Sequence, residues 1–153
     1  MTTSREDGSG RLAIGQLLVG LLREFRTELF APAAAQGYDD LREPHLHIFG
    51  SVGVTGIRLT ELSARAQLSP ATTSELVTDL ERLGYLERRP DPTDRRAKLI
   101  FPTRRGRQAL HDAGTRVAEI ERHWSDLVGN ARFADACATL QAILDELGEE
   151  GSE

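Results

Sequence analysis

Residues 59–84 read LTELSARAQLSPATTSELVTDLERLG, two short helical patterns separated by a turn of about three residues. The apolar side chains of the first pattern fall on one side of a helix: Leu59, Leu62 and Ala66. The second pattern begins with Ser69, which can cap free backbone N–H groups, and Pro70, which needs no N–H partner in a first turn. Gly84 ends it. Two such helices joined by a short turn predict a helix-turn-helix.

A β-hairpin is predicted directly after the second helix. Residues 85–89 and 97–101 are predicted as strands, and PDPTDRR at residues 90–96 connects them. Two prolines and two aspartates in this connection are typical of a turn. A hairpin in this position is a wing, so residues 41–103 are predicted to form a winged helix-turn-helix domain.

Long helices with narrow apolar seams are predicted on both sides of this domain. Apolar residues recur every three or four positions along residues 12–30, 104–128 and 130–147. Thr103 is expected to cap the helix at 104–128, and Gly129-Asn130 interrupts the pattern. A chain of 153 residues has too little core to bury all these seams alone, so we expect a homodimer.

The predicted fold class is therefore mainly α with a small β wing. A short helix is expected at residues 43–50, followed by a glycine-rich connector at 50–56. Outside the winged domain the expected parts are a disordered N-terminus (1–10), dimerisation helices (11–31 and 130–147), a long linking helix (104–128) and a disordered acidic tail (148–153).

Basic residues are concentrated in the wing and in the start of the following helix. The whole chain carries a net charge of −5, but residues 85–107 contain eight basic and three acidic side chains, a net +5 that leaves −10 elsewhere. A basic patch on an acidic body is expected of a protein that binds nucleic acid with one face. A solvated surface loop would have the same composition, so charge alone leaves both interpretations open.

Several classes of protein are disfavoured by the sequence. No apolar run approaches the roughly 18 residues of a membrane span, and residues 1–10 lack a signal-peptide pattern. The single cysteine, Cys137, excludes an internal disulfide framework, so a cytoplasmic location is expected. We also expect no enzymatic activity, because the sequence has no glycine-rich phosphate loop, paired catalytic carboxylates, Ser-His motif or Cys-His motif.

The chain resembles the MarR family of bacterial transcriptional regulators over residues 12–147. The helix pair and three motifs carry the resemblance: GYLER at 84–88, DPTDRR at 91–96 and TRRG at 103–106. It implies a homodimer whose first and last helices interlock, with recognition helices in successive major grooves of a pseudo-palindromic operator and wings in the flanking minor grooves. It also implies a small effector, often aromatic or phenolic, that binds between the dimerisation helices and the DNA-binding lobe and releases the DNA.

Three residues depart from the family pattern. Gln67 occupies a turn position that often holds glycine, so a left-handed backbone there would be strained by roughly 1 kcal/mol. Pro102 replaces a leucine. Glu75 stands on the recognition helix where many members carry a basic residue, so the operator preferences of relatives do not transfer.

Helical spacing turns one side of the recognition helix away from its apolar stripe. Ala71, Ser74, Glu75 and Thr78 lie on this side with Thr72 at its edge, where side chains can reach base edges in a major groove. Ser69 and the helix N-terminus suit a phosphate. The alternative interpretation is an ordinary polar helix face.

The wing supplies the other expected DNA contacts. The resemblance assigns Arg96 to the minor groove, with Asp94 bracing it through a charge-assisted hydrogen bond. A narrow minor groove concentrates negative potential, which suits an arginine. Arg88, Arg89 and Arg95 are expected at phosphates or beside their own aspartates.

Five residues are candidates for the effector crevice, and packing in the core is an equally open alternative for them: Phe25, Tyr38, His45, Phe49 and His111. Cys137 falls in the apolar seam of the last helix and is expected to be a buried structural thiol rather than a redox sensor. No cofactor or metal is expected, although a zinc site built from Glu24, His45 and His111 stays open.

The predicted function is a ligand-responsive transcriptional regulator, a repressor, that binds operator DNA as a homodimer. Two alternatives stay open: a winged-helix module for protein interaction, and a zinc-sensing regulator of the same family.

Overall fold

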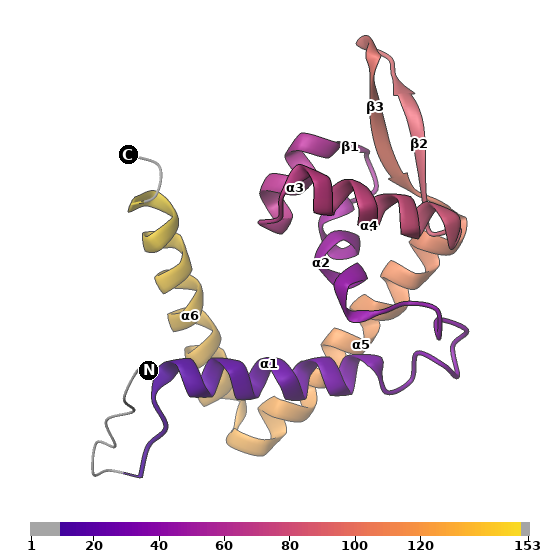
Figure 1. Cartoon of the computed structure of the whole chain (residues 1–153). Coiled ribbons are helices and arrows are strands. Elements are labelled where there is room, and N and C mark those ends of the chain that lie inside the picture. Colours follow the sequence, from indigo (N-terminus) through magenta and orange to yellow (C-terminus); the bar gives the residue numbers. More distant parts are fainter. Residues whose placement is uncertain (1–9, 151–153) are drawn as a thin grey trace, which may run out of the picture. The chain divides into compact units, whose positions relative to one another are not determined.

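The computed structural model describes residues 10–150, which form six helices and one small antiparallel sheet (Figure 1). Its elements are α1 (Ile14–Phe30), α2 (Glu43–Val52), β1 (Ile57–Arg58), α3 (Leu59–Ala66), α4 (Pro70–Arg82), β2 (Leu86–Asp91), β3 (Asp94–Pro102), α5 (Arg104–Val128) and α6 (Asn130–Glu150). The chain divides into two compact units, Met1–Leu110 and His111–Glu153, so the boundary falls inside α5. The predicted class, mainly α with a small β wing, is confirmed.

The helix pair α3 and α4 forms where the sequence predicts it. Gln67 ends α3 in the left-handed conformation with φ 54° and ψ 41°, as expected for the turn, and Gln67 N–H donates to the Ala64 carbonyl. Ser69 then caps α4, because its Oγ accepts a hydrogen bond from Thr72 N–H at 3.1 Å. Pro70 fills the first position of α4. Local sequence therefore determines both ends of the turn.

One hydrophobic core joins α2, α3, α4 and the sheet in the first unit. Its buried residues come from every one of these elements and from the start of α5: Ile48, Phe49, Val52, Ile57, Leu62, Val77, Leu80, Tyr85, Leu86, Ile100 and Ala109. Burying a side chain of this size stabilises the folded state by about 1.5–3 kcal/mol. The recognition helix is thus fixed to the sheet and to α2 through its apolar stripe.

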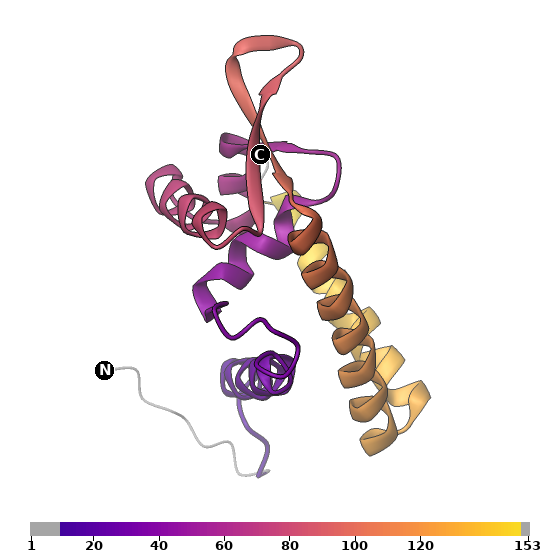
Figure 2. The same cartoon turned by 90° about the vertical axis from the view of Figure 1, so that its right-hand side faces the viewer.

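The sheet has the strand order β1-β3-β2, and all neighbours are antiparallel. The predicted strands at residues 85–89 and 97–101 were too short, because pairing continues to Asp91 and Asp94 and leaves only Pro92 and Thr93 as the turn. The two-residue strand β1, Ile57–Arg58, was not predicted, since a segment this short carries no periodic signal. Beyond β1 the hairpin stands out from α3 and α4 in both views (Figures 1 and 2).

Helix α6 lies almost entirely exposed along its length in the single chain. It continues to Glu150, so the prediction that a disordered tail begins at residue 148 was wrong for residues 148–150. Residues 1–9 of the expected disordered N-terminus and residues 151–153 of the expected tail lie outside the described residues.

Helix α1 also contains no buried residue. The large exposed apolar side chains of α1 and α6 are Ile14, Leu18, Val19, Leu21, Leu22, Leu140, Ile143, Leu144 and Leu147. Within residues 10–150, no helix combines the length and the apolar character needed to cross a membrane.

Candidate nucleic-acid interface

The outer side of α4 presents short polar side chains together with one carboxylate. Ala71, Thr72, Glu75 and Thr78 are exposed, and Ser74 is half-buried. These are the residues that the sequence placed away from the apolar stripe, and the buried positions of Thr73, Val77 and Leu80 agree with that assignment. The Ser69 hydroxyl also donates to Thr72 Oγ1 at 2.9 Å, so the first turn is held in a defined geometry.

Glu75 has neither a hydrogen-bond partner nor an ion-pair partner among residues 10–149. The guanidinium of Arg82, seven residues further along the helix, pairs with Asp79 instead. The carboxylate of Glu75 is therefore a free hydrogen-bond acceptor on the outer side of α4.

Asp79 gathers three donors from two helices. Arg42 Nη2 donates to Asp79 Oδ2 at 2.8 Å and His45 Nε2 at 2.7 Å, while Arg82 pairs with Oδ1. Hydrogen bonds from Arg82, His45 and Arg42 hold the pKa of Asp79 well below its usual range. The cluster fixes the start of α2 against the last turn of α4.

The tautomer of His45 follows from its two contacts. Its Nδ1 accepts the Arg42 backbone N–H at 3.0 Å, so in the neutral ring the proton lies on Nε2 and is donated to Asp79. The side chain is completely buried. His45 therefore has a structural partner on each ring nitrogen. Asp79 and Arg42 were missed in the sequence, because a partner 34 or 37 residues away leaves no local pattern.

An open groove of about 490 Å³ runs along α4 beside this cluster. It is lined by Arg42, Ser74, Glu75, Leu76, Thr78, Asp79 and Arg82. The candidate base-reading residues Ser74, Glu75 and Thr78 thus share one concave surface with two arginines.

The arginines of the wing divide into paired and unpaired side chains. Arg88 Nε lies 2.8 Å from Glu81 Oε1 in an ion pair that lacks the alignment of a hydrogen bond, so Arg88 is held against α4. Arg89 pairs with Glu87 and stacks 4.7 Å from the centre of the Phe101 ring. The structure therefore gives Arg88 a glutamate of α4 as its partner, in place of the aspartate or phosphate expected for it.

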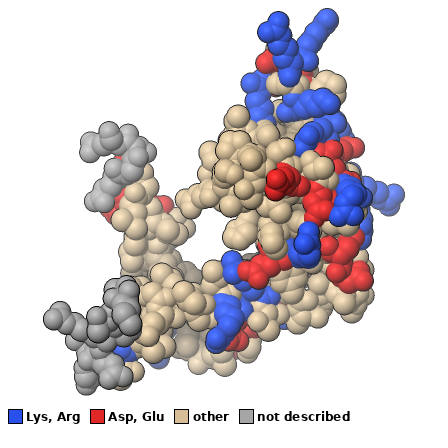
Figure 3. Space-filling view, in the orientation of Figure 1, with Lys and Arg blue, Asp and Glu red and all other residues tan. Residues whose placement is uncertain are grey.

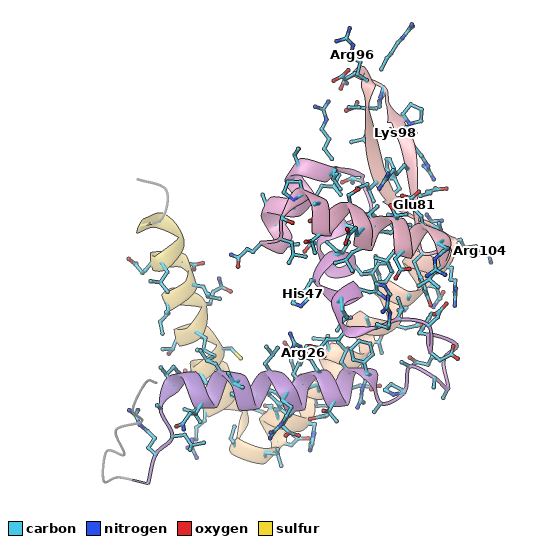
Figure 4. The ribbon with its side chains drawn as sticks, viewed as in Figure 1. Arg26, His47, Glu81, Arg96, Lys98 and Arg104 are labelled. Atoms are coloured by element: carbon cyan, nitrogen blue, oxygen red, sulfur yellow. The ribbon has the colours of Figure 1, made fainter. Side chains whose placement is uncertain are left out.

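Three cations of the wing have side chains without an ion-pair partner in the described part of the chain: Arg95, Arg96 and Lys98. Arg96 lies at the tip of the hairpin and Lys98 further down β3 (Figure 4). Lys and Arg side chains gather over the hairpin, whereas the surface over α3 and the start of α4 is mostly uncharged and charges of both signs mix below the hairpin (Figure 3). Strand β3 thus presents three unpaired positive charges within four residues.

Asp94 braces Arg96 through the backbone. Its Oδ1 accepts the Arg96 backbone N–H at 3.0 Å, so the expected charge-assisted hydrogen bond forms but does not involve the guanidinium. The Arg96 side chain remains exposed.

Asp91, which the sequence did not single out, has more partners than Asp94. Arg58 Nε and Nη2 donate to its Oδ2 at 3.0 and 2.6 Å, and Thr93 N–H and Oγ1 donate to its Oδ1 at 2.8 and 2.7 Å. An aspartate two residues before a threonine at a turn was a recognisable local signal, whereas its pairing with Arg58 was not.

The candidate effector residues do not gather at the groove along α4, whose lining contains none of them. His45 and Phe49 are buried, and Tyr38 packs against the core with its ring 6.3 Å from that of Tyr85. Phe25 and His111 belong to different compact units. The structure thus gives His45, Phe49 and Tyr38 a packing role, and the crevice stays a prediction.

The described residues contain no group of three His, Cys, Asp or Glu side chains placed to hold a metal ion. Cys137 is exposed in the single chain, so the expectation that it is buried is not met there. The reason is that the whole seam of α6 lacks a covering element within its own unit.

Comparisons with known proteins place this arrangement in a family. Residues 39–97 match the model of the MarR family. CouR from Rhodococcus jostii RHA1 bound to p-coumaroyl-CoA is 27% identical, with a TM-score of 0.67 over 85% of this chain and 90% of that chain. No curated protein sequence matches the chain.

Two further solved structures share the fold at lower identity. FabT from Streptococcus pneumoniae in complex with DNA is 18% identical, with a TM-score of 0.76 over 89% of this chain and 96% of that chain. Wild-type MarR from E. coli is 19% identical, with a TM-score of 0.64 over 90% of this chain and 98% of that chain. The winged helix-turn-helix and its flanking helices are therefore the fold of this chain.

Proposed function

Since the chain belongs to the MarR family, we propose that it is a transcriptional regulator that binds operator DNA as a homodimer. The observation that carries the proposal is the set of unpaired cations on the wing, beside a capped and exposed α4, in a chain of net charge −5. Such an arrangement directs one face toward phosphate while the rest of the molecule repels it. The proposed role includes no catalytic step.

In this proposal α4 enters the major groove. Ser74, Glu75 and Thr78 reach base edges with Ala71 and Thr72 beside them, because they occupy its exposed side. Ser69 and the free N–H groups of the first turn lie against a phosphate. The complex of FabT with DNA supports DNA binding by this fold, by analogy alone.

The wing contributes the flanking contacts. Arg96 is proposed for the minor groove and Arg95 for a phosphate, since both side chains are exposed and unpaired in the described chain. Asp94 holds the Arg96 backbone. Arg88 has a supporting role, because it would have to leave Glu81 to reach DNA.

A second copy of the chain is the proposed partner of α1 and α6. Their exposed leucine, isoleucine and valine side chains are poorly suited to remain in water, and each 100 Å² of apolar surface buried by association contributes about 2.5 kcal/mol before the costs of binding. The same association would cover Cys137.

We further propose repression that a small aromatic or phenolic effector relieves, in the cytoplasm where the operator is accessible. The support is CouR, whose solved structure contains p-coumaroyl-CoA. Phe25, Tyr38, His45, Phe49 and His111 remain the candidate contacts. Because His45 and Phe49 are buried, an effector would reach them only after a local rearrangement.

The test begins with selection of duplexes from a random-sequence pool by the wild-type protein. We expect a pseudo-palindrome with half-sites about 10 base pairs apart. Affinity should fall linearly with salt on logarithmic axes, because phosphate contacts release counterions. Sedimentation at micromolar concentration should give a dimer. Failure to enrich any duplex would contradict the proposal and favour a protein-interaction module.

Addition of phenolic acids and their CoA thioesters to the complex of protein and duplex then tests the effector class.

A further inference from the structure

The ion pair between Arg58 and Asp91 connects the helix-turn-helix to the far part of the wing. Arg58 is the last residue of β1 and directly precedes α3, and Asp91 is the last residue of β2. Because β3 lies between these strands, the Arg58 side chain reaches past the central strand to its partner. The bond therefore joins two segments that the sheet does not pair directly.

The geometry is that of a fixed connection. Asp91 is only 6% exposed, Arg58 gives it two donors on one oxygen, and Thr93 gives two on the other. The hydrogen bonds from Thr93 and Arg58 lower the pKa of Asp91 to about 2, so the carboxylate is charged at neutral pH. One carboxylate thus binds both the turn, through Thr93, and strand β1, through Arg58.

The hairpin needs such a connection, because its far half has no third strand. Strand β1 pairs only at Ile57↔Ile100 and Arg58↔Leu99, whereas β2 and β3 continue to Asp91 and Asp94. A ribbon of two strands is marginally stable by itself and twists readily.

Arg58 and Lys98 lie on opposite faces of the sheet. Paired residues share a face and side chains alternate along a strand, so Arg58 shares the face of Leu99, while Lys98 and Ile100 occupy the other face. The register shift between Pro90 and Asp91 interrupts this alternation toward the tip of the hairpin. Figure 4 shows Arg96 and Lys98 at successive heights on this ribbon.

Taking the proposed DNA-binding function as given, we propose that Arg58 and Asp91 are positioning residues for the wing. Their ion pair holds the far half of the hairpin at a fixed angle to α4, so that Arg96 and Lys98 meet the DNA while α4 occupies the major groove. Neither residue contacts DNA itself. Preorganisation of this kind improves affinity by reducing the entropy lost on binding.

The first test compares two variants that break the pair with one matched control. Asp91→Asn keeps an oxygen for Thr93 but loses the charge, and Arg58→Met keeps the side-chain length without donors. Both should bind the selected duplex about tenfold more weakly, a change of about 1.4 kcal/mol. The salt slope of Asp91→Asn should equal that of wild type, because no phosphate contact is lost. Arg89→Met removes a cation whose partner lies on the same strand and should change affinity less than about threefold.

A double-mutant cycle with Arg96→Ala separates positioning from a general structural effect. If the pair acts by placing the wing, Asp91→Asn should lower the affinity for the duplex about tenfold when Arg96 is present and less than about twofold in the Arg96→Ala background.

Methylation footprints of the bound duplex should show the same separation of wing and recognition helix. Protection of adenine N3 in the flanking minor grooves should be lost, while protection of guanine N7 in the half-sites should persist. Circular dichroism and thermal unfolding identify a variant that does not fold, in which case the other variant decides.

Three results would overturn the inference. Wild-type affinity of Asp91→Asn would show that the wing needs no brace, and the proposed function would survive. A salt slope reduced by about one in Arg58→Met, with Asp91→Asn unchanged, would make Arg58 a phosphate contact. If the wild-type protein selects no duplex, the proposed function fails and this inference fails with it.

Discussion

At the scale of the residue, the partner of a charged side chain decides its role. Arg88 and Arg89 lie in the wing and Arg58 beside it, yet each is held by a carboxylate of the chain: Glu81, Glu87 and Asp91. The Arg96 side chain has no such partner within the described residues. An unpaired guanidinium keeps all its donors for a phosphate or a groove and has no internal contact to break.

The replacement Arg96→Ala should weaken operator binding by about 1–3 kcal/mol and leave thermal unfolding unchanged, because the side chain is exposed and contributes nothing to the core. Asp94→Ala should cause a smaller loss, since it removes only a bond to the Arg96 backbone. Electrophoretic mobility shifts would measure both. Equal affinity of both variants and wild type would remove the minor-groove role.

The replacement Glu75→Gln should relax discrimination at one base position. The free carboxylate of Glu75 can accept a hydrogen bond from a cytosine amine, and glutamine offers a donor as well as an acceptor. Competition between the operator and its single-base variants measures the effect. The matched control is Glu61→Gln on α3, where the carboxylate already pairs with Arg65. An identical ranking of all single-base variants by Glu75→Gln and wild type would mean that Glu75 reads no base.

At the scale of the element, contacts between the ends of helices define how the recognition helix is held. The α4–β2 turn and the start of α5 are joined by Thr103, whose N–H donates to Tyr85 O and whose Oγ1 donates to Gly84 O. The Thr103 Oγ1 also accepts the Gly106 N–H at 3.0 Å, which confirms the predicted cap. Arg105 donates to the Leu83 carbonyl at the end of α4. The first turn of α5 is therefore attached to the C-terminal end of the recognition helix.

The replacement Gly106→Ala should push the first turn of α5 away from the α4–β2 turn. The protein should be destabilised by about 2 kcal/mol or more, the range of an overpacked site. A Cβ at Gly106 would lie 2.0 Å from the backbone oxygen of Tyr85, which cannot move without shifting the turn. Gly114→Ala on the same helix is the control, because its added methyl meets no atom within 4 Å. Chemical unfolding should show a loss for the first variant and a gain of up to about 1 kcal/mol for the second.

The replacement Gln67→Gly should raise the free energy of unfolding by about 0.5–1 kcal/mol. Gln67 has φ 54°, where a side chain is strained and glycine is not. The control is Ala64→Gly, an exposed position inside α3, which should lower the free energy of unfolding by about 0.5–1 kcal/mol. A loss of stability in Gln67→Gly comparable to that of the control would contradict the strain.

At the scale of the whole molecule, the hydrophobic core stabilises the winged unit, whereas the apolar faces of α1 and α6 stay exposed. The buried residues come from α2 to the start of α5, whereas α1 contributes none of its 17 residues. Within α6, Leu144 and Leu147 are 66% and 59% exposed. A single chain thus buries the core of the winged helix-turn-helix but leaves the apolar faces of α1 and α6 uncovered.

The replacement Leu144→Glu should convert the proposed dimer into monomers and weaken operator binding at least tenfold, because a charge in an apolar interface is costly and half-sites would be bound one at a time. Sedimentation and mobility shifts would measure both effects. Val54→Glu is the control, since Val54 is 67% exposed in the connector before β1. Dimers of Leu144→Glu with wild-type affinity would exclude this face from the interface.

The sequence by itself determined the elements whose signals are local. Ser69 and Pro70 mark the start of α4, and the spacing of apolar residues gives the buried stripe, because each depends on neighbours within about one helical turn. The polar residues on the outer side of α4 could be identified for the same reason. The exposed arginines of the wing were found from a motif, also a local feature.

Only the tertiary structure decided which charges are free and where the strands end. Arg58 and Asp91 are 33 residues apart, and Arg42 and Asp79 are 37 apart, so no spacing rule connects them. Strand β1 and the extension of β2 and β3 depend on pairing with distant residues, which local propensity does not encode. A basic side chain stays unpaired when no distant carboxylate reaches it, and the folding of the whole unit determines that distance.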